Sequence, residues 1–391
     1  MKNTMPIIST RKYSAVLLIL TSLLFLSCEK TILGPDNNIS PLPKIHASRL
    51  ATILDSLRYT LDFPALAGAV ITDTGIIDAQ AVGCRRYGGE VNITNNDQFH
   101  LGSNSKAISA VLLGILIDEG HLNWTTTLPA IFPEYASSMR AEYRNVTIRD
   151  LLSHSSGFMR DPTQTFHNGT PRDQRIELIA WAFTQPPAIA RGTFLYSNLG
   201  YIIAGAIAEK LTDRQFEELL LEKVLQPLGI TSAGFGPMGT PGKEDQPLQH
   251  TNSHSPIEPT PDADNDPVYS PPGRLHMAIG DWAKYIQWVL AAEAGHQTLV
   301  SPQTAAVLTS SIVPQDGEGY YACGWGVINR DWAGGRTLVH SGSNGFNYSE
   351  AALAPGKHFA VIAATNQGPG DQANPIDPAI GRLINFYLNK Q

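Results

Sequence analysis

Residues 98–118 read QFHLGSNSKAISAVLLGILID. The pattern predicts a short strand over 98–102 and an apolar helix over Lys106–Asp118. Ser103 then stands at the start of the helix. Because residues three apart share a helix face, the Lys106 amine can reach the Ser103 hydroxyl. The positive end of the helix field also favours negative charge developing at this serine.

The four-residue pattern S-x-x-K is weak by itself, because it also starts at Ser9 and Ser27, in or at the edge of the N-terminal apolar segment. Y-x-N occurs three times, and only Tyr196–Asn198 is predicted to lie in a loop that opens a helix. H-x-G occurs twice, and only His340–Gly342 follows a predicted strand with further strand after it. Order and context therefore select one set: Ser103 with Lys106, then Tyr196 with Asn198, then His340 with Gly342.

Strand patterns lie at both ends of the chain. A helix over 47–61 precedes a hairpin over 66–72 and 76–82, whose Thr72–Gly75 link is a turn signal. Four strands and a final helix are predicted near the C-terminus, over 324–329, 337–340, 348–353, 359–365 and 377–388. Mostly helical periodicity fills the interval. The expected fold is α/β (α+β): an antiparallel sheet formed from both chain ends and flanked by helices, with an inserted, mainly helical region.

The expected domain covers residues 46–391, with its α/β part at about 46–120 and 312–391 and its helical part at about 121–311. Within the latter, residues 237–272 contain nine prolines together with Asp, Asn and Ser, which predicts a long irregular loop. Long loops on compact domains are often functional. We expect this one to border the site and to influence which acyl groups are accepted.

The three motifs in this order resemble the signature of class C β-lactamases and their esterase and D,D-peptidase relatives, within the serine β-lactamase and penicillin-binding-protein family. Further segments strengthen the resemblance: LLSHSSGF at 151–158, PLGI at 227–230, GFG at 234–236 and PG at 272–273 before DWA at 281–283. The resemblance runs from about His46 to the C-terminus. It implies a serine hydrolase that works through an acyl-enzyme and needs no metal or organic cofactor.

The resemblance also implies a role for each motif residue. Ser103 would attack the substrate carbonyl, and Lys106 and Tyr196 would take and relay its proton, with the division between them open. Asn198 would hydrogen-bond the acyl side of the substrate, and His340 and Gly342 would line the opposite wall. The backbone N–H of Ser343 would complete an oxyanion hole with that of Ser103.

His340 departs from the lysine that the lactamases proper carry at this position. A histidine is largely neutral at pH 7 unless a partner raises its pKa, so recognition of a substrate carboxylate should be weaker or pH-dependent. Arg274, where many relatives have glycine, is expected to be a surface arginine, with a compensating charge as the alternative. Esters or D-amino-acid peptides and amides are therefore the expected substrates. A true β-lactamase and a non-catalytic penicillin- or peptidoglycan-binding envelope protein are the alternatives.

The N-terminus indicates export. Basic residues precede an apolar stretch over 15–26, and the segment ends in Phe25-Leu26-Ser27-Cys28, which resembles a bacterial lipobox. Residues 1–28 are expected to be a lipoprotein-type signal that anchors the protein in the bacterial cell envelope through lipidated Cys28, and residues 29–45 a flexible tether. The alternative is an ordinary cleaved signal peptide with an incidental cysteine.

Composition excludes several other classes. With 42% hydrophobic and 16% charged residues, the chain can bury a large core. A net charge of −7, with no basic run beyond the N-terminus, argues against nucleic acid as a partner. The histidines at 250, 254 and 276 lack the spacing of a metal site. Cys84 and Cys323 are expected to be small buried hydrophobes, with a disulfide as the alternative.

Overall fold

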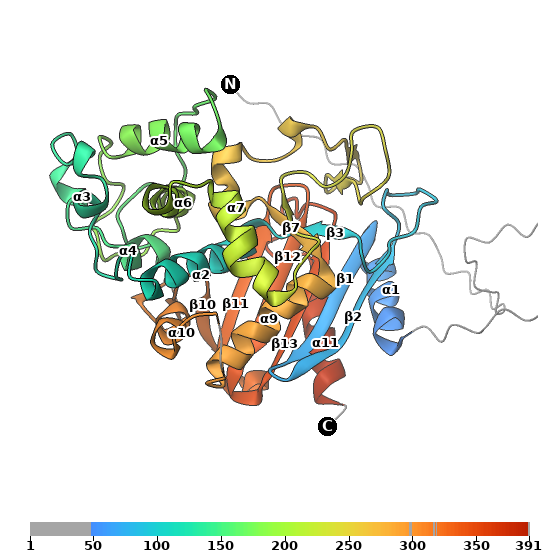
Figure 1. Cartoon of the computed structure of the whole chain (residues 1–391). Helices are drawn as coiled ribbons and strands as arrows, with labels where there is room; N and C mark the ends of the chain where they lie inside the picture. Colours follow the sequence, from blue (N-terminus) through green and yellow to red (C-terminus); the bar gives the residue numbers. More distant parts are fainter. Residues whose placement is uncertain (1–47, 297–298, 316, 318, 390–391) are drawn as a thin grey trace, which may run out of the picture. The chain divides into compact units, whose positions relative to one another are not determined.

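The computed structural model describes residues 48–296, 299–315, 317 and 319–389 (Figure 1). The signal segment, Cys28 and the tether predicted from the sequence lie outside these residues. In the part of the chain that is described, no helix combines the length and the apolar character needed to cross a bilayer.

An eight-stranded antiparallel sheet forms the centre of the fold, in the order β2-β1-β13-β12-β11-β10-β9-β8. Its strands come from the two ends of the described chain, which confirms the predicted α/β fold with an antiparallel sheet (Figure 1). The strands are β1 (Ala65–Thr72), β2 (Gly75–Gly83), β8 (Val313–Pro314), β9 (Tyr320–Tyr321), β10 (Gly326–Arg330), β11 (Gly335–Ser343), β12 (Tyr348–Ala354) and β13 (Phe359–Thr365).

Alternation along the strands sends apolar side chains to two separate cores, because successive residues of a strand point to opposite faces. On β1, Leu66 and Val70 pack in the core beside α1 (Arg49–Leu61) and α11 (Asp377–Leu388). Ala67 and Ala69 face the larger core. That second face is covered by α9 (Ile279–Glu293), which contacts β1, β2 and β13 although it comes from the interval between the two β-rich ends.

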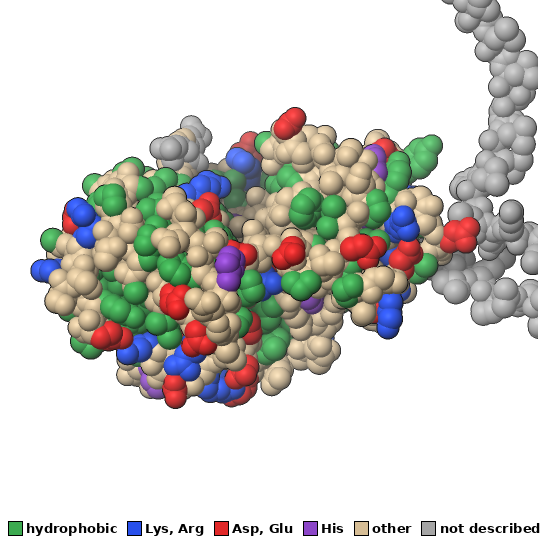
Figure 2. All heavy atoms as spheres, turned by 90° about the horizontal axis from the view of Figure 1, so that it is seen from above, with side chains coloured by type: hydrophobic (Ala, Val, Ile, Leu, Met, Phe, Trp, Pro, Cys, Tyr) green, Lys and Arg blue, Asp and Glu red, His purple; other side chains and the backbone are tan. Residues whose placement is uncertain are grey.

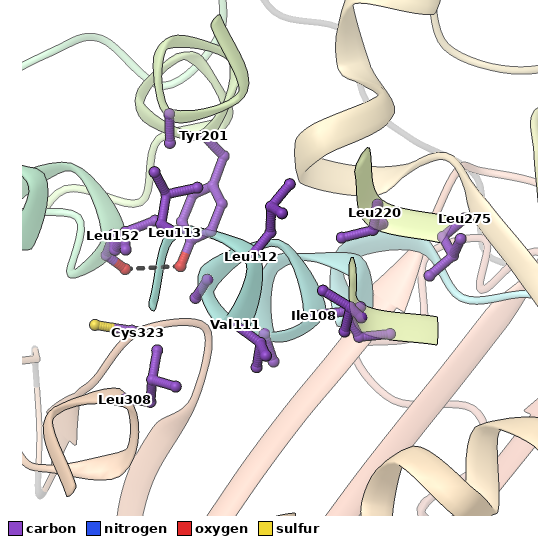
Figure 3. Close-up of a cluster of buried hydrophobic side chains, with 14 of the residues drawn as sticks. Ile108, Val111, Leu112, Leu113, Leu152, Tyr201, Leu220, Leu275, Leu308 and Cys323 are labelled. Atoms are coloured by element: carbon purple, nitrogen blue, oxygen red, sulfur yellow. Dashed lines mark hydrogen bonds between the residues drawn. The ribbon is translucent and has the colours of Figure 1, made fainter. Parts of the chain in front are cut away.

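Helix α2 (Ser105–Asp118) runs through the larger core, and its residues 105–116 are all buried. A helix that is apolar on every side is stable only when it is surrounded by other elements. Figure 3 shows this environment: Ile108, Val111, Leu112 and Leu113 lie among side chains from several other segments, including Leu152, Tyr201, Leu220, Leu275, Leu308 and Cys323. The Tyr201 hydroxyl donates to the Leu152 carbonyl at 2.7 Å, so this buried hydroxyl has a hydrogen-bond partner.

The remaining helices lie between the two β-rich ends, and each of them contacts α2, α6 or both. They are α3 (Leu128–Ile131), α4 (Ile148–Leu152), α5 (Pro171–Ala182), α6 (Asn198–Thr212), α7 (Phe216–Leu220), α8 (Ser270–Gly273) and α10 (Pro302–Thr309). Arg175 of α5 joins this group by buried ion pairs with Glu209 and Glu217, at 2.6 and 3.0 Å. Figure 2 views the molecule from above and shows acidic and basic side chains interspersed on that face.

A second, three-stranded sheet is not predicted by the sequence analysis. It has the order β3-β7-β4, from β3 (Gln98–His100), β7 (Leu275–Ala278) and β4 (Gly234–Phe235). The strand predicted over 98–102 therefore ends at His100. The Leu101 N–H continues the pairing by donating to the Leu275 carbonyl at 2.8 Å. This sheet fixes the residues immediately before Ser103.

The proline-rich stretch over 237–272 is irregular apart from short elements, among them β5 (Gln249–His250) and β6 (Pro256–Ile257). It is anchored by Asp264, whose side chain is fully buried and lies 2.9 Å from His100 Nε2. Cys84 and Cys323 do not pair with each other; Cys323 is buried, as expected, whereas Cys84 is half-buried.

Candidate active site

Ser103 lies in a single 3-10 turn over Gly102–Asn104, between β3 and α2. The turn packs against β11, a strand from the C-terminal part of the chain. A Cβ added at Gly102, whose φ is +50°, would lie 2.3 Å from the backbone N of Ser343. A Cβ added at Gly342 would lie 2.6 Å from the backbone N of Ser103. Both glycines are required by this close approach, which brings the Ser103 and Ser343 backbones together.

The Lys106 amine lies 3.0 Å from Ser103 Oγ and donates to the Pro272 carbonyl at 2.9 Å. The residue is fully buried. Burial lowers the pKa of Lys106 well below its ordinary value, because removal from water destabilises the charged form. A neutral amine beside the hydroxyl is able to accept its proton.

The ring of Tyr196 packs against this amine, with its centroid 4.8 Å from Lys106 Nζ. Burial raises the pKa of Tyr196, although a hydrogen bond with the Ser103 side chain acts in the opposite direction. The phenol is therefore protonated near neutral pH. Its position is supported by His154, whose ring lies 4.3 Å from that of Tyr196 and whose Nδ1 accepts from the Ser197 N–H at 3.0 Å.

His340 on β11 has both ring nitrogens in hydrogen bonds. Nδ1 lies 2.7 Å from the Ser341 carbonyl, which can only accept, so Nδ1 carries the proton. Nε2 then accepts from the Tyr321 hydroxyl at 2.9 Å. Burial lowers the pKa of His340 to about 3, with a further contribution from Lys106. The side chain is neutral at physiological pH, so it offers no positive charge to a substrate carboxylate.

Two clefts meet at Ser103. The larger has a volume of about 610 Å³, and Arg160, Phe194, Tyr321 and Tyr348 are among its walls. The residues predicted from the sequence that line it are Ser103, Tyr196, Asn198, His340, Gly342 and Ser343. The smaller, of about 290 Å³, is lined by Ser103, Asp161, Asn198, Asn265, Tyr269, Pro272, Gly273 and Ser343. Three of these, Asn265, Tyr269 and Pro272, belong to the proline-rich stretch, which borders the site as expected.

Asn198 begins α6 and is held by its neighbours from the 158–161 segment. Its backbone N–H donates to the Arg160 carbonyl and its Nδ2 donates to Asp161 Oδ1, both at 2.7 Å. Because an ionised carboxylate only accepts, the Asp161 contact fixes the orientation of the Asn198 amide. Asp161, Tyr321 and the support from His154 are the parts of the site that the motifs do not reveal.

Arg274 is neither the expected surface arginine nor a charge at the site. Only 9% of the residue is exposed, and it lines neither cleft at Ser103. Its Nε lies 3.6 Å from Asp264 Oδ2. The sequence gives no partner for this arginine, because Asp264 belongs to the irregular stretch. Within the described residues, no group of three or more His, Cys, Asp or Glu side chains has the geometry to hold a metal ion.

A family model described as Beta-lactamase matches residues 50–385, which includes nearly all of the described chain and every motif residue from Ser103 to Ser343. The chain belongs to this family. Its relatives include "Unguisins hydrolase ungD'" of Aspergillus campestris, 28% identical, with 79% of this chain and 60% of the relative covered. "Penicillin-binding protein 4" of Amycolatopsis lactamdurans is 29% identical, with 80% and 84% covered. The chain thus spans less than two thirds of the Aspergillus relative.

Solved structures show the same fold. An octameric penicillin-binding protein homologue from Pyrococcus abyssi superposes with a TM-score of 0.70 at 21% identity, covering 87% of this chain and 77% of that one. The D-alanine carboxypeptidase AmpC from Burkholderia cenocepacia gives a TM-score of 0.67 at 17% identity, covering 86% and 97%. At these identities the likeness establishes the β-lactamase and penicillin-binding-protein fold and nothing about the substrate.

Proposed function

We propose that this chain is a serine hydrolase that forms an acyl-enzyme on Ser103 and acts on esters or on D-amino-acid peptides and amides. The observation that carries the proposal is the buried amine of Lys106, 3.0 Å from Ser103 Oγ, with a pKa lowered by that burial. A lysine held neutral beside a serine at the meeting point of two clefts is the arrangement that makes a hydroxyl nucleophilic. The hydrolase and penicillin-binding protein among the relatives support the same class of chemistry.

Acylation follows from this geometry. Ser103 Oγ attacks the carbonyl carbon while Lys106 Nζ takes the hydroxyl proton, and the carbonyl electron pair moves onto oxygen. The backbone N–H groups of Ser103 and Ser343 stabilise that oxygen. When the intermediate collapses, the bond to the leaving group breaks, and the leaving group takes a proton from the Tyr196 hydroxyl. Lys106 returns its proton to Tyr196.

Deacylation regenerates the enzyme. Water attacks the acyl carbon and gives a proton to Lys106 Nζ, the bond to Ser103 Oγ breaks as the carbonyl forms again, and the serine oxygen takes the proton back from Lys106. The raised pKa of Tyr196 suits it to donate and relay, whereas the lowered pKa of Lys106 suits it to accept. We therefore assign Lys106 as the principal base.

The same site also supports a second candidate, a β-lactamase or penicillin-binding protein that accepts a carboxylate in the larger cleft. Arg160 lines that cleft, and its guanidinium lies 5.2 Å from the Tyr196 ring centroid. Its charge could replace the one that His340 lacks. The side chain of Arg160 is 66% exposed, so water weakens this contribution, and we rank esters and D-amino-acid amides first.

The test is a direct comparison of wild type with Ser103→Ala. Hydrolysis of p-nitrophenyl acetate and covalent labelling by a fluorescent penicillin are measured for both, with Ser56→Ala on the exposed side of α1 as the control. We expect the Ser103 variant to lose at least about a thousandfold in ester turnover and all labelling. Equal rates in wild type and Ser103→Ala, or no reaction in wild type, would overturn the proposal and favour a non-catalytic binding protein.

We also propose that Cys28 is lipidated and anchors the protein in a bacterial envelope, on the basis of the basic, apolar and Ser27-Cys28 pattern at the N-terminus. The full chain and Cys28→Ser are expressed in bacteria with labelled palmitate and fractionated. Label and membrane association in the full chain only are expected. An unlabelled full chain in the soluble fraction would instead identify an ordinary cleaved signal.

A further inference from the structure

The smaller cleft contains a carboxylate that the mechanism does not use. Asp161 Oδ1 accepts from Asn198 Nδ2 at 2.7 Å and from the Tyr269 hydroxyl at 3.4 Å. Among the residues that the structure describes, Oδ2 has one ionic neighbour, Arg160 Nε at 3.7 Å. With the Arg160 side chain 66% exposed and the Asp161 side chain 42% exposed, this ion pair is long and solvated and contributes little. One oxygen of Asp161 is thus available to a ligand.

Asn198 makes the neighbouring wall an acceptor as well. Its Nδ2 is directed at Asp161, so its Oδ1 is the atom left to meet a ligand. Asp161 and Asn198 together present a carboxylate oxygen and an amide oxygen to the same cleft. Two acceptors, one of them ionised, match a group that carries positive charge and several N–H donors.

The position of Tyr196 identifies which part of the substrate enters this cleft. The residue that protonates the leaving group must contact it, and Tyr196 lines the larger cleft and not the smaller one. The leaving group therefore occupies the larger cleft, and the acyl group occupies the smaller. At about 290 Å³ the smaller cleft is below the range of about 300–1,000 Å³ that is usual for drug-sized ligands.

We propose that Asp161 binds a protonated amine on the acyl group, so that the substrates are small aminoacyl esters or amides with a free amino group. This inference rests on the proposed acyl-enzyme function and adds the chemical class of the acyl group. Asp161 holds the ammonium through Oδ2, and Asn198 Oδ1 accepts a second N–H from it. Acetylation of the amine removes its charge and puts a carbonyl group against two acceptors, so an acetylated substrate is disfavoured.

The field of this carboxylate reaches the reacting groups. Asp161 raises the pKa of Lys106, against the larger opposing effect of burial, and it contributes to the raised pKa of Tyr269 after burial. An ammonium bound at Asp161 would neutralise this field. Substrate with a free amine would then keep Lys106 neutral more effectively than an empty site does, which couples recognition to activation of Ser103.

The experiment measures competition against p-nitrophenyl acetate turnover. D-alanine methyl ester and its N-acetyl derivative are each titrated as competitors, and the ratio of their inhibition constants is the readout. In wild type we expect the free amine to compete about tenfold or more better. The ratio should fall to about one or two in Asp161→Asn. It should persist in Asp262→Asn, which removes an exposed carboxylate from the nearby 261–263 turn.

Two further measurements sharpen the result. Arg160→Gln removes the cation that competes for Asp161, so the advantage of the free amine should be kept or increased. The advantage should also decrease as the pH rises through the pKa of the substrate amine, because the neutral amine lacks the charge. A ratio near one in wild type, no competition by either compound, or an unchanged ratio in Asp161→Asn would overturn the amine site. If wild type shows no Ser103-dependent turnover of p-nitrophenyl acetate, the proposed function itself is overturned.

Discussion

Burial, rather than neighbouring charge, sets the protonation of the groups around Ser103. Lys106 and His340 are buried and Tyr196 is half-buried, and for each of them burial is the largest influence on the pKa. The same influence acts in opposite directions, since it lowers the pKa of a base and raises that of a phenol. Burial therefore favours a neutral amine, a protonated phenol and a neutral imidazole within one site.

The neutral amine has a consequence for stability. Burial holds the pKa of Lys106 in the fold well below its unfolded value of about 10.4, so between these two pKa values the unfolded state binds more protons. Stability should therefore rise with pH, by about 1 kcal/mol per pH unit from this residue, and Lys106→Met should lack that increment. Urea unfolding of both proteins at pH 7, 8 and 9 tests this. Parallel pH dependences would mean that the amine is charged in the fold.

The neutral imidazole makes a prediction about substrate charge. With a pKa of about 3, His340 stays uncharged from pH 5 to 8, so it should cause no rise in penicillin labelling as the pH falls. Placing a lysine there supplies the missing charge, and His340→Lys should label about tenfold faster than wild type. Tyr321→Phe, which removes the donor to Nε2 without adding charge, is the control. Equal labelling by wild type and His340→Lys would count against a role for charge at this position.

At the scale of single residues, the sequence identifies those side chains that recur in short patterns of fixed spacing. Ser103 and Lys106 are one helical turn apart, and their contact follows from that spacing. Asp161 and Tyr321 could not be found in this way, because each acts through a residue distant in sequence. Arg274 was wrongly expected at the surface for the same reason. An arginine is rarely buried without a carboxylate partner, and its partner Asp264 belongs to an irregular stretch.

Long elements were predictable, whereas of the short strands around the Ser103 turn only β3 was. The strands β1, β12 and β13 have seven or eight residues, enough for alternation or a continuous apolar run to be visible. The strands β3, β7 and β4 have three, four and two residues, too few for any period. Such strands are stable because their partners hold them. Of this sheet the sequence predicts only β3, as a strand over 98–102, and neither of the partners β7 and β4 that hold it in place.

The proline-rich stretch is held to the site by Asp264. Its carboxylate lies 2.9 Å from His100 Nε2 and accepts from Asn344 Nδ2 at 3.1 Å, so it joins the segment before Ser103 to the turn after β11. His100 Nδ1 in turn accepts from the Gly102 N–H at 3.1 Å. This one side chain connects the three segments that surround the nucleophile.

Asp264→Asn should reduce the free energy of unfolding by about 3 kcal/mol, because Arg274 keeps a buried charge without a partner. Burial acts to raise the pKa of Asp264, but His100 and Arg274 outweigh it and hold that pKa below its ordinary value. The contribution of the carboxylate is therefore present above the unfolded pKa and lost as the pH falls through the folded one. Denaturant unfolding at pH 7 checks the first value. Asp262→Asn, an exposed neighbour, should change stability by less than about 0.5 kcal/mol.

For the molecule as a whole, the sheet separates the site from one of its two cores. Helix α11 packs beneath β13 and β1 together with α1, and a Cβ added at Gly68 would lie 3.0 Å from Leu54 and 3.1 Å from Leu383. This core contains none of Ser103, Lys106, Tyr196 and His340. It stabilises the sheet without touching substrate.

Leu383→Ala should therefore lower stability and spare catalysis. Leu383 is fully buried, and the cavity left by its truncation should reduce the free energy of unfolding by about 2–5 kcal/mol. Arg382→Ala, its exposed neighbour on α11, should be close to neutral. Unfolding curves and ester kinetics below the unfolding temperature are measured for both. A clear change in the KM for the ester in Leu383→Ala, but not in Arg382→Ala, would show that this core is coupled to the site.

The contact between Gly102 and Ser343 also makes the site depend on two segments that are far apart in the sequence. Ser103 and Lys106 precede β11 in the chain, so the two glycine-lined backbones can meet only after both have been made. A nascent chain, or one truncated before residue 335, carries its serine and lysine without the strand that borders them. The serine therefore lacks part of its surroundings until the Ser103 turn and β11 are both present and packed together.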